Sequence, residues 1–228
     1  MCQTRRINRV VLQVIRDRSS VRNFSDKEVS NEVILDILEA ARLAPSWVNV
    51  QPWHFIVVRD RETKELLSQL SHGQAHVMQS PVIIVCCGDT EAWETEKYKE
   101  ILELRPGITE EKVNAFLNSP VLNPKVKGKE AVICRTVEEV TYAVAYMTLE
   151  AHNKGVGACV VGAVGNELTE SIPEVYQQVR EKLGLKDNIM LISLLLLGYP
   201  AADFQKPNKV RRVPDEIISF ERYGNKKI

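Results

Sequence analysis

The sequence lacks a charge excess of either sign and any long apolar run. Lysine and arginine together number 30, as do aspartate and glutamate, so the formal net charge of the 228 residues is zero. Nucleic-acid and membrane-surface binders normally carry a basic excess, and we expect neither partner. The most apolar stretch, 189–197, has the length of a strand and not of a membrane span. With no signal peptide recognised, these features predict a cytoplasmic protein.

Cysteine is scarce and follows no disulfide framework. All five cysteines are expected to be buried, reduced thiols, including the neighbours Cys86 and Cys87 in an apolar run. Adjacent side chains of a strand point to opposite faces, so these two are not expected to form a redox pair. His72 and His76 are four residues apart without a third ligand, which favours two partly exposed helix histidines over a metal site.

Two nucleotide-binding signatures are missing as well. The chain has no P-loop, and Gly155-Val156-Gly157 lacks the third glycine of a dinucleotide fingerprint. That run also precedes an expected strand, whereas the fingerprint opens a helix. A Rossmann site is therefore not expected.

Apolar periodicity predicts intermixed helices and strands. Two Ser/Thr-x-x-Glu capping boxes are expected, at 136–139 and 171–174, and Ser30 is expected to cap a helix. Because the elements lack the regular βαβ alternation of a doubly wound sheet, the pattern predicts an α+β fold. The expected helices are 8–16, Ser30 to Pro45, 62–70, Thr136 to Gly155 and Ser171 to Gly184, and the strands are 55–58, 82–87, 158–161 and 189–197.

Residues 91–129 differ from the rest of the chain. They are highly charged, contain Pro106, Pro120 and Pro124, and show only short helical patches. Such a segment buries little apolar surface alone. We therefore expect a mobile insertion or lid over one domain that spans residues 1–228.

The segment from Arg18 to Phe24, RSSVRNF, is the first of three with an unusual mixture of side chains. Two arginines four residues apart, with two hydroxyls between them, suit a phosphate-bearing ligand, because guanidinium and hydroxyl groups donate to phosphate oxygens. A helix cap followed by a solvated basic turn is equally compatible with this segment.

The second segment runs from Ala44 to Phe55, APSWVNVQPWHF. Its tryptophans offer flat surfaces beside the amides of Asn49 and Gln51, a combination that suits a planar heterocycle. The alternative is a packed turn with the tryptophans in the core, and we expect that placement for Trp53. The third segment, KVRRVPDE at 209–216, adds cations but alone is typical of a solvated charge run.

These segments occur in a fixed order: RSSVRNF, ARLAPSWVNVQPWHF, the G-x-G-x-C-x-x-G-A run from Gly155 to Ala163, and RRVPDE. In this order they resemble the signature of the FMN-dependent nitroreductase family over residues 18–218, with 91–129 as the variable region. The resemblance implies a central mixed, mostly antiparallel sheet flanked by helices, in a domain-interlocked homodimer with two FMN sites at the interface.

The resemblance also assigns roles to single residues. Arg18, Ser19 and Ser20 are implied at the phosphate side of FMN. Arg22 is implied at the N1/O2 edge of the flavin ring, and the pair Gly162-Ala163 near the N5/O4 edge. Residues of the second segment would reach the flavin held mainly by the other subunit: Pro45, Ser46, Trp47 and Asn49. In the third segment Arg212 is the expected phosphate arginine, with Arg211 and Lys209 as weaker candidates.

The resemblance implies an oxidoreductase that passes electrons from NADH or NADPH through FMN to a small oxidant, such as a nitroaromatic or quinone. Ping-pong kinetics and no catalytic side chain are expected. Trp47 stands where a small residue is frequent in the family, and Gly162 where some members carry an acid. A specialised relative (flavin reductase, ene-reductase or dehalogenase) therefore stays open, as does a flavin-binding module without turnover.

Overall fold

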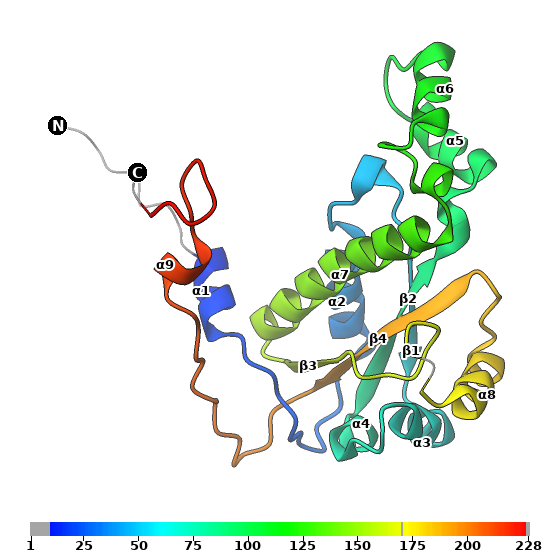
Figure 1. Cartoon of the computed structure of the whole chain (residues 1–228). Helices are drawn as coiled ribbons and strands as arrows, with labels where there is room; N and C mark the ends of the chain where they lie inside the picture. Colours follow the sequence, from blue (N-terminus) through cyan, green and yellow to red (C-terminus); the bar gives the residue numbers. More distant parts are fainter. Residues whose placement is uncertain (1–9, 170, 227–228) are drawn as a thin grey trace.

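A computed structural model describes residues 10–169 and 171–226, arranged around a four-stranded sheet (Figure 1). Each neighbouring pair of strands is antiparallel, and Ser20 adds an isolated parallel bridge to Ala158. The expected α+β class with a mostly antiparallel sheet is confirmed. The strands are β1 (Trp53–Val58), β2 (Val82–Asp89), β3 (Gly157–Val161) and β4 (Ile189–Gly198), in the order β1-β2-β4-β3.

The central strands β2 and β4 are buried because they carry apolar side chains toward both faces. Along β2, Ile84 and Cys86 belong to one core cluster, and Ile83 and Cys87 to the other. The two cysteines therefore point to opposite faces, as expected, even though the pairing with β4 shifts register between them. Burial raises the pKa of Cys87 to about 12.

The other cysteines agree only in part with the expectation of burial. Cys159 of β3 is a buried free thiol. Cys134 is exposed, because it lies on the solvent side of a helix whose opposite side packs on the sheet. Cys2 lies outside the described residues.

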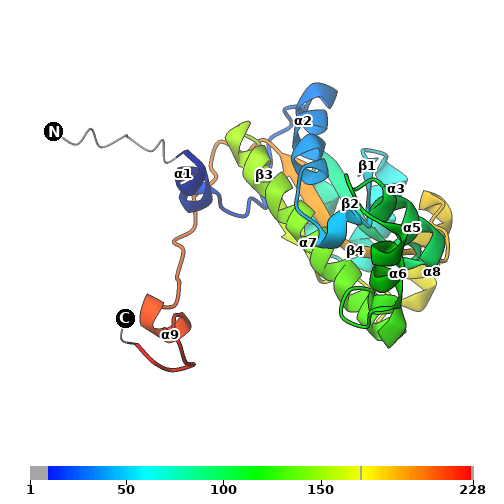
Figure 2. The same ribbon diagram turned by 90° about the horizontal axis from the view of Figure 1, so that it is seen from above.

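Helices cover both faces of the sheet and give three layers (Figures 1 and 2). Each turns an apolar stripe inward, as in α2, where Ile34, Ile37 and Ala41 are buried. Ser30 caps α2 as expected, by accepting the backbone N–H of Val33 at 3.3 Å. On one face lie α2 (Asn31–Arg42) and α7 (Lys129–Asn153), and on the other α3 (Arg61–Leu70), α4 (Ala75–Gln79) and α8 (Pro173–Leu183).

α7 begins at Lys129, so the capping box expected at 136–139 is wrong. Thr136 and Glu139 lie inside the helix and are buried. Each accepts a hydrogen bond from a distant segment, from Trp93 and Trp47 respectively. The Thr-x-x-Glu pattern predicts a cap only from neighbouring residues. Here the Thr136 hydroxyl and the Glu139 carboxylate instead accept hydrogen bonds from residues that are distant in the sequence. The helix ends as expected, with Gly155 at a φ of 73°.

The second capping box, at 171–174, is also wrong. Pro173 is the first helical residue of α8, and the N-cap is Ile172, whose side chain accepts no hydrogen bond. Proline starts the helix without a side-chain cap because its φ is already helical and it lacks the N–H that a cap would satisfy. Gly184 ends α8 in the left-handed conformation, as expected.

Residues 91–129 rise from one end of the sheet as short helices (Figure 1). Trp93, Tyr98 and Val113 are buried in a third core cluster, which also contains Val50 and Val132 of the main body. Because that cluster is shared, we propose that this insertion folds with the rest of the chain as one domain. Its elements are η2 (Thr90–Trp93), α5 (Thr95–Glu103), α6 (Glu110–Asn118) and η3 (Pro124–Lys127).

α1 (Val10–Asp17) lies at the C-terminal end of α7, and the C-terminal segment 200–226 leaves the three layers beside it (Figure 2). The C-terminal segment has no regular secondary structure apart from α9 (Pro214–Ile217), and a turn follows at 220–224. Val210 is 84% exposed. The expected start of the first helix at Asn8 lies outside the described residues. Across 10–169 and 171–226, no helix combines the length and apolarity needed to cross a membrane.

Candidate functional site

The first motif lies along the β3 edge of the sheet. Ser20 forms its bridge with Ala158, and the backbone N of Val21 donates to the carbonyl oxygen of Ala158 at 3.0 Å. Gly157 permits this approach, because a Cβ there would stand 2.8 Å from the Val21 side chain. The first motif and the glycine run at 155–163 are thus brought side by side.

A cavity of about 220 Å³ opens where the first motif meets the C-terminal end of α7. The start of the C-terminal segment also lines it, and Lys206 there lies 3.3 Å from the Asp17 carboxylate. The polar side chains that line it are Asp17, Arg18, Ser19, Thr148, His152 and Lys206.

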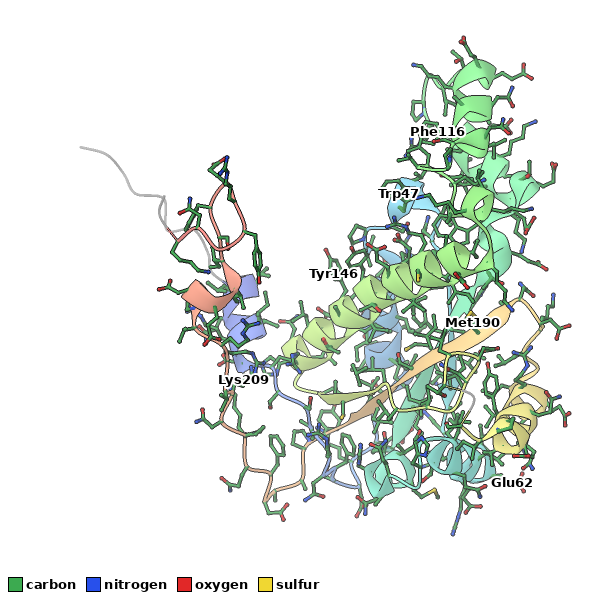
Figure 3. All side chains as sticks on the ribbon, viewed as in Figure 1. Trp47, Glu62, Phe116, Tyr146, Met190 and Lys209 are labelled. Carbon is green, nitrogen blue, oxygen red and sulfur yellow. The ribbon has the colours of Figure 1, made fainter. Side chains whose placement is uncertain are left out.

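Cations outnumber anions around this cavity. Lys209 donates to the carbonyl oxygen of Arg16 at 2.5 Å, which holds it against the end of α1 (Figure 3). Desolvation, joined by the positive charges of Arg18, Lys206 and Arg211, lowers the pKa of Lys209. Such a concentration of positive charge beside a hydroxyl is what a phosphate group needs.

Arg22 lies further along the same edge. Burial raises the pKa of the Cys159 thiol, and the nearby guanidinium groups of Arg22 and Arg18 oppose that rise. Gly162 and Ala163 follow directly after β3 and are exposed. The fold therefore places part of both implied sets along a single edge: Arg18, Ser19 and Ser20 of the phosphate set, and Arg22, Gly162 and Ala163 of the ring set.

The loop at 45–51 takes a different position, under the insertion (Figure 3). The backbone N of Trp47 donates to Glu139 Oε2 at 2.9 Å, and its indole Nε1 donates to the carbonyl oxygen of Leu122 at 3.0 Å. The guanidinium of Arg135 lies 4.7 Å from the centre of the Trp47 ring. Trp47 is thus half-buried against the insertion, whereas Asn49 is exposed. Trp53 meets the expectation of a core residue only in part: it packs against a core cluster but stays partly exposed, because it begins the edge strand β1.

α7 sets the distance between this loop and the cavity. The loop is held at Glu139, and the cavity is lined by His152 of the same helix. Thirteen residues of α-helix correspond to roughly 20 Å. One chain therefore does not bring its own 45–49 loop to its own cavity.

The C-terminal cations divide into two groups. Lys209 reaches the end of α1, and Arg211 is close enough to influence it. Arg212 instead pairs with Glu216, with 2.9 Å between Nε and Oε2. Both arginines are exposed. Of the three candidates, Lys209 is thus the one on which the charge of Arg18 acts within one chain.

Three comparisons with known proteins agree. Residues 15–199 match the model of the Nitroreductase family. The chain belongs to the nitroreductase family. A Thermus thermophilus protein named NADH dehydrogenase is 32% identical over 82% of this chain and 84% of its own length. The FMN reductase [NAD(P)H] of Bacillus subtilis is 29% identical over 92% of this chain and 73% of its own.

A solved nitroreductase-like protein from Streptococcus mutans shares the fold of this family member. The TM-score is 0.76 at 22% identity, and the match covers 92% of this chain and 98% of the other. The order of motifs in the sequence thus identified the family correctly, and the antiparallel sheet with flanking helices that it implied for the chain is confirmed. The implied homodimer stays a prediction.

Lys206 and His152 of this nitroreductase-family chain were missed by sequence reasoning, although both line the cavity. Lys206 belongs to no motif, and the position of His152 near a helix end does not distinguish it from an ordinary polar surface residue. The only available signal was the density of cations between Lys206 and Arg212. Lys206 and His152 become candidate site residues only because the fold brings them to the cavity that Arg18 also lines.

The two histidines that are four residues apart lie in different local structures. His76 lies in α4, whereas His72 sits in the turn before it at a φ of 57°, so it is not the helix residue that was expected. Desolvation and the charge of Arg22 lower the pKa of His76. No group of three potential metal ligands occurs within the described part of this nitroreductase-family chain.

Proposed function

We propose that this chain is an FMN-dependent oxidoreductase that takes electrons from NADH or NADPH and passes them to a small oxidant. The observation that carries the proposal is the cation-rich cavity that Arg18 and Lys206 form beside β3. A relative named FMN reductase [NAD(P)H] supports both the flavin and the nicotinamide.

The residues present fit the two ends of FMN. Arg18, Lys206 and the Ser19 hydroxyl offer charged and neutral donors for a phosphate. Arg22, exposed on the same edge, offers a cation for the N1/O2 edge of the ring, where a positive charge stabilises the anionic reduced flavin. Bound FMN would supply the hydride and electron chemistry, and the protein contributes binding, orientation and electrostatics.

A homodimer completes the proposed site. α1 and α7 border an apolar groove of about 560 Å³, lined by Val11, Ile15, Tyr146 and Leu149. Val11 is 68% exposed and Tyr146 is 42% exposed, which is costly for apolar side chains unless another surface covers them. Because the 45–49 loop is too far from its own cavity, we propose that a second copy covers the groove and supplies its loop to the first copy's flavin.

Purification and turnover test the proposal directly. We expect a yellow protein whose visible band resembles that of FMN and is bleached by NADPH or NADH under anaerobic conditions. Steady-state assays with a quinone or nitroaromatic should give parallel double-reciprocal lines, as ping-pong exchange requires. A colourless protein that takes up no added FMN would refute the proposal. A yellow protein that never turns over would instead be a flavin-binding module.

A further inference from the structure

Three residues of the 45–51 loop have left-handed backbones without being glycine. Val48, Asn49 and Gln51 have φ values of 54°, 64° and 50°. The left-handed region is strained for L-residues, and most for a β-branched residue such as Val48. Such conformations persist only where surrounding contacts enforce them, and they gather at functional sites.

Besides the bond from the Trp47 indole to the carbonyl oxygen of Leu122, two hydrogen bonds from backbone N–H groups to side chains hold the loop in this shape. Within the loop, the Ser46 hydroxyl accepts the backbone N–H of Gln51 at 3.1 Å. From outside, Glu139 Oε2 accepts the backbone N–H of Trp47 at 2.9 Å. The second contact joins the loop to the middle of α7, the most extended rigid element of the described chain.

Glu139 is an unfavourable residue for a purely structural role. It is 1% exposed, and the Trp47 N–H is its one hydrogen-bond partner among the described residues. Burying a carboxylate with a single donor costs free energy that an apolar residue at the same helix position would not cost. The presence of a buried carboxylate that lowers stability is better explained by a functional contact, here the bond to the backbone of Trp47.

We propose that Glu139 is a positioning residue, which fixes the strained 45–51 loop in the shape that contacts the flavin of the partner subunit. The inference rests on the proposed function, because it assigns the loop to an FMN site. Glu139 itself touches no flavin in this arrangement. It acts through the backbone of Trp47 and sets where Pro45, Ser46 and Asn49 lie.

The test compares three variants as FMN-loaded dimers. Glu139→Met keeps the side-chain length but removes the acceptor, whereas Glu139→Gln keeps an oxygen that can accept the Trp47 N–H. Thr136→Val is the matched control, because Thr136 is also buried in α7 and also accepts one N–H, from Trp93 of the insertion at 2.9 Å. FMN dissociation constants and melting temperatures are measured for all three and for the wild type.

Glu139→Met removes the hydrogen bond that holds the loop in its flavin-contacting shape. We therefore expect it to raise the FMN dissociation constant on the order of tenfold. Glu139→Gln should remain within about twofold of the wild type, and Thr136→Val should lower the melting temperature without weakening FMN binding. Equal FMN affinity in Glu139→Met and the wild type would overturn the inference, as would equal weakening in Glu139→Met and Thr136→Val.

Glu139→Asp covers the case in which Glu139→Met does not fold. The shorter side chain withdraws the carboxylate from the Trp47 N–H while keeping its charge, so FMN should again bind more weakly than in Glu139→Gln. Unchanged affinity in Glu139→Asp would contradict the proposal. A wild-type protein that binds no FMN would refute the proposed function itself, which separates the two failures.

Discussion

Arg18 gains its neighbours only through folding. In the sequence it precedes two serines, which fit a basic turn as well as a phosphate site. In the structure it shares a cavity with Lys206 and lies near Lys209, from the far end of the chain. Three cations beside the one carboxylate of Asp17 favour the phosphate interpretation, because the excess positive charge is repulsive until an anion binds.

Replacing Arg18 tests that interpretation. Arg18→Ala removes a charge-assisted contact that contributes about 1.5–3 kcal/mol, so the FMN dissociation constant should rise roughly ten- to hundredfold. Arg16→Ala is the matched control, since Arg16 is exposed in the last turn of α1 and does not line the cavity. Fluorescence titration with FMN measures both. Identical affinities in the two variants would remove Arg18 from the phosphate site.

At the scale of elements, α7 organises the site. Its 25 residues extend over roughly 37 Å, from Val132 at the insertion to the cavity at His152. One side packs on the sheet, while Thr136 and Glu139 hold the insertion and the 45–51 loop. A single rigid helix thus fixes the relative positions of the cavity, the loop and the insertion.

Asp89 joins two further elements, the end of β2 and the start of β4. Its carboxylate accepts from the backbone N of Glu91 at 2.8 Å, from Asn188 Nδ2 at 2.7 Å and from Lys97 Nζ at 3.2 Å. Burial alone would raise the pKa of Asp89, but these donors, together with His54, outweigh it and hold the pKa well below its usual range. The ionised form therefore stabilises the folded state.

The pH dependence of stability follows from that shift. Above the unfolded-state pKa of 3.8 the contribution of Asp89 is fully present, and it is lost as the pH falls toward the lower folded-state pKa. Asp89→Asn should therefore lower the free energy of unfolding by about 1–3 kcal/mol at pH 7. The difference from the wild type should shrink as the pH drops below 3.8.

Urea unfolding at several pH values measures this effect. Glu91→Gln is the control, because the Glu91 side chain makes an exposed pair with Lys97 at 3.2 Å, and such pairs contribute little, while its backbone N–H to Asp89 is kept. A difference between wild type and Asp89→Asn that stays constant down to pH 2 would show that charge is not the cause.

At the scale of the whole molecule, the proposed site is divided between two places that one chain holds apart. The cavity with Arg18 lies at one end of α7 and the 45–51 loop near its middle. The apolar groove beside α1 and the exposed Val210 and Ile217 offer a surface for a second copy. Dimer formation and FMN binding should therefore be coupled.

Ile15→Asp tests the coupling. Ile15 lines the groove and is 47% exposed, so a charge there should disfavour the dimer without disturbing the core of the monomer. Leu104→Asp is the control, because Leu104 is 79% exposed at the end of α5, away from the groove. Analytical ultracentrifugation with detection at the flavin band should show monomers depleted of FMN for Ile15→Asp only. A dimer that keeps its flavin would contradict the proposed interface.

The sequence by itself determined the strands and most of the helices. Buried runs such as 82–87 and 189–197 are apolar on both sides, and that composition leaves few alternatives to central strands. Helix ends marked by backbone constraints, such as Gly155 and Gly184, were also predictable. The start of α7 was not predictable, nor was the absence of a side-chain cap on α8, because a potential capping side chain can bond elsewhere when the fold offers another partner.

Only the tertiary structure decided how the candidate site is assembled. The motifs were visible as four separate segments, but a linear pattern contains no distances between them. Folding places Arg18 against β3, brings Lys206 and Lys209 to it, and carries the 45–51 loop roughly 20 Å away along α7. Long-range packing sets these positions, since hydrogen bonds between distant residues depend on the whole fold and not on neighbouring residues.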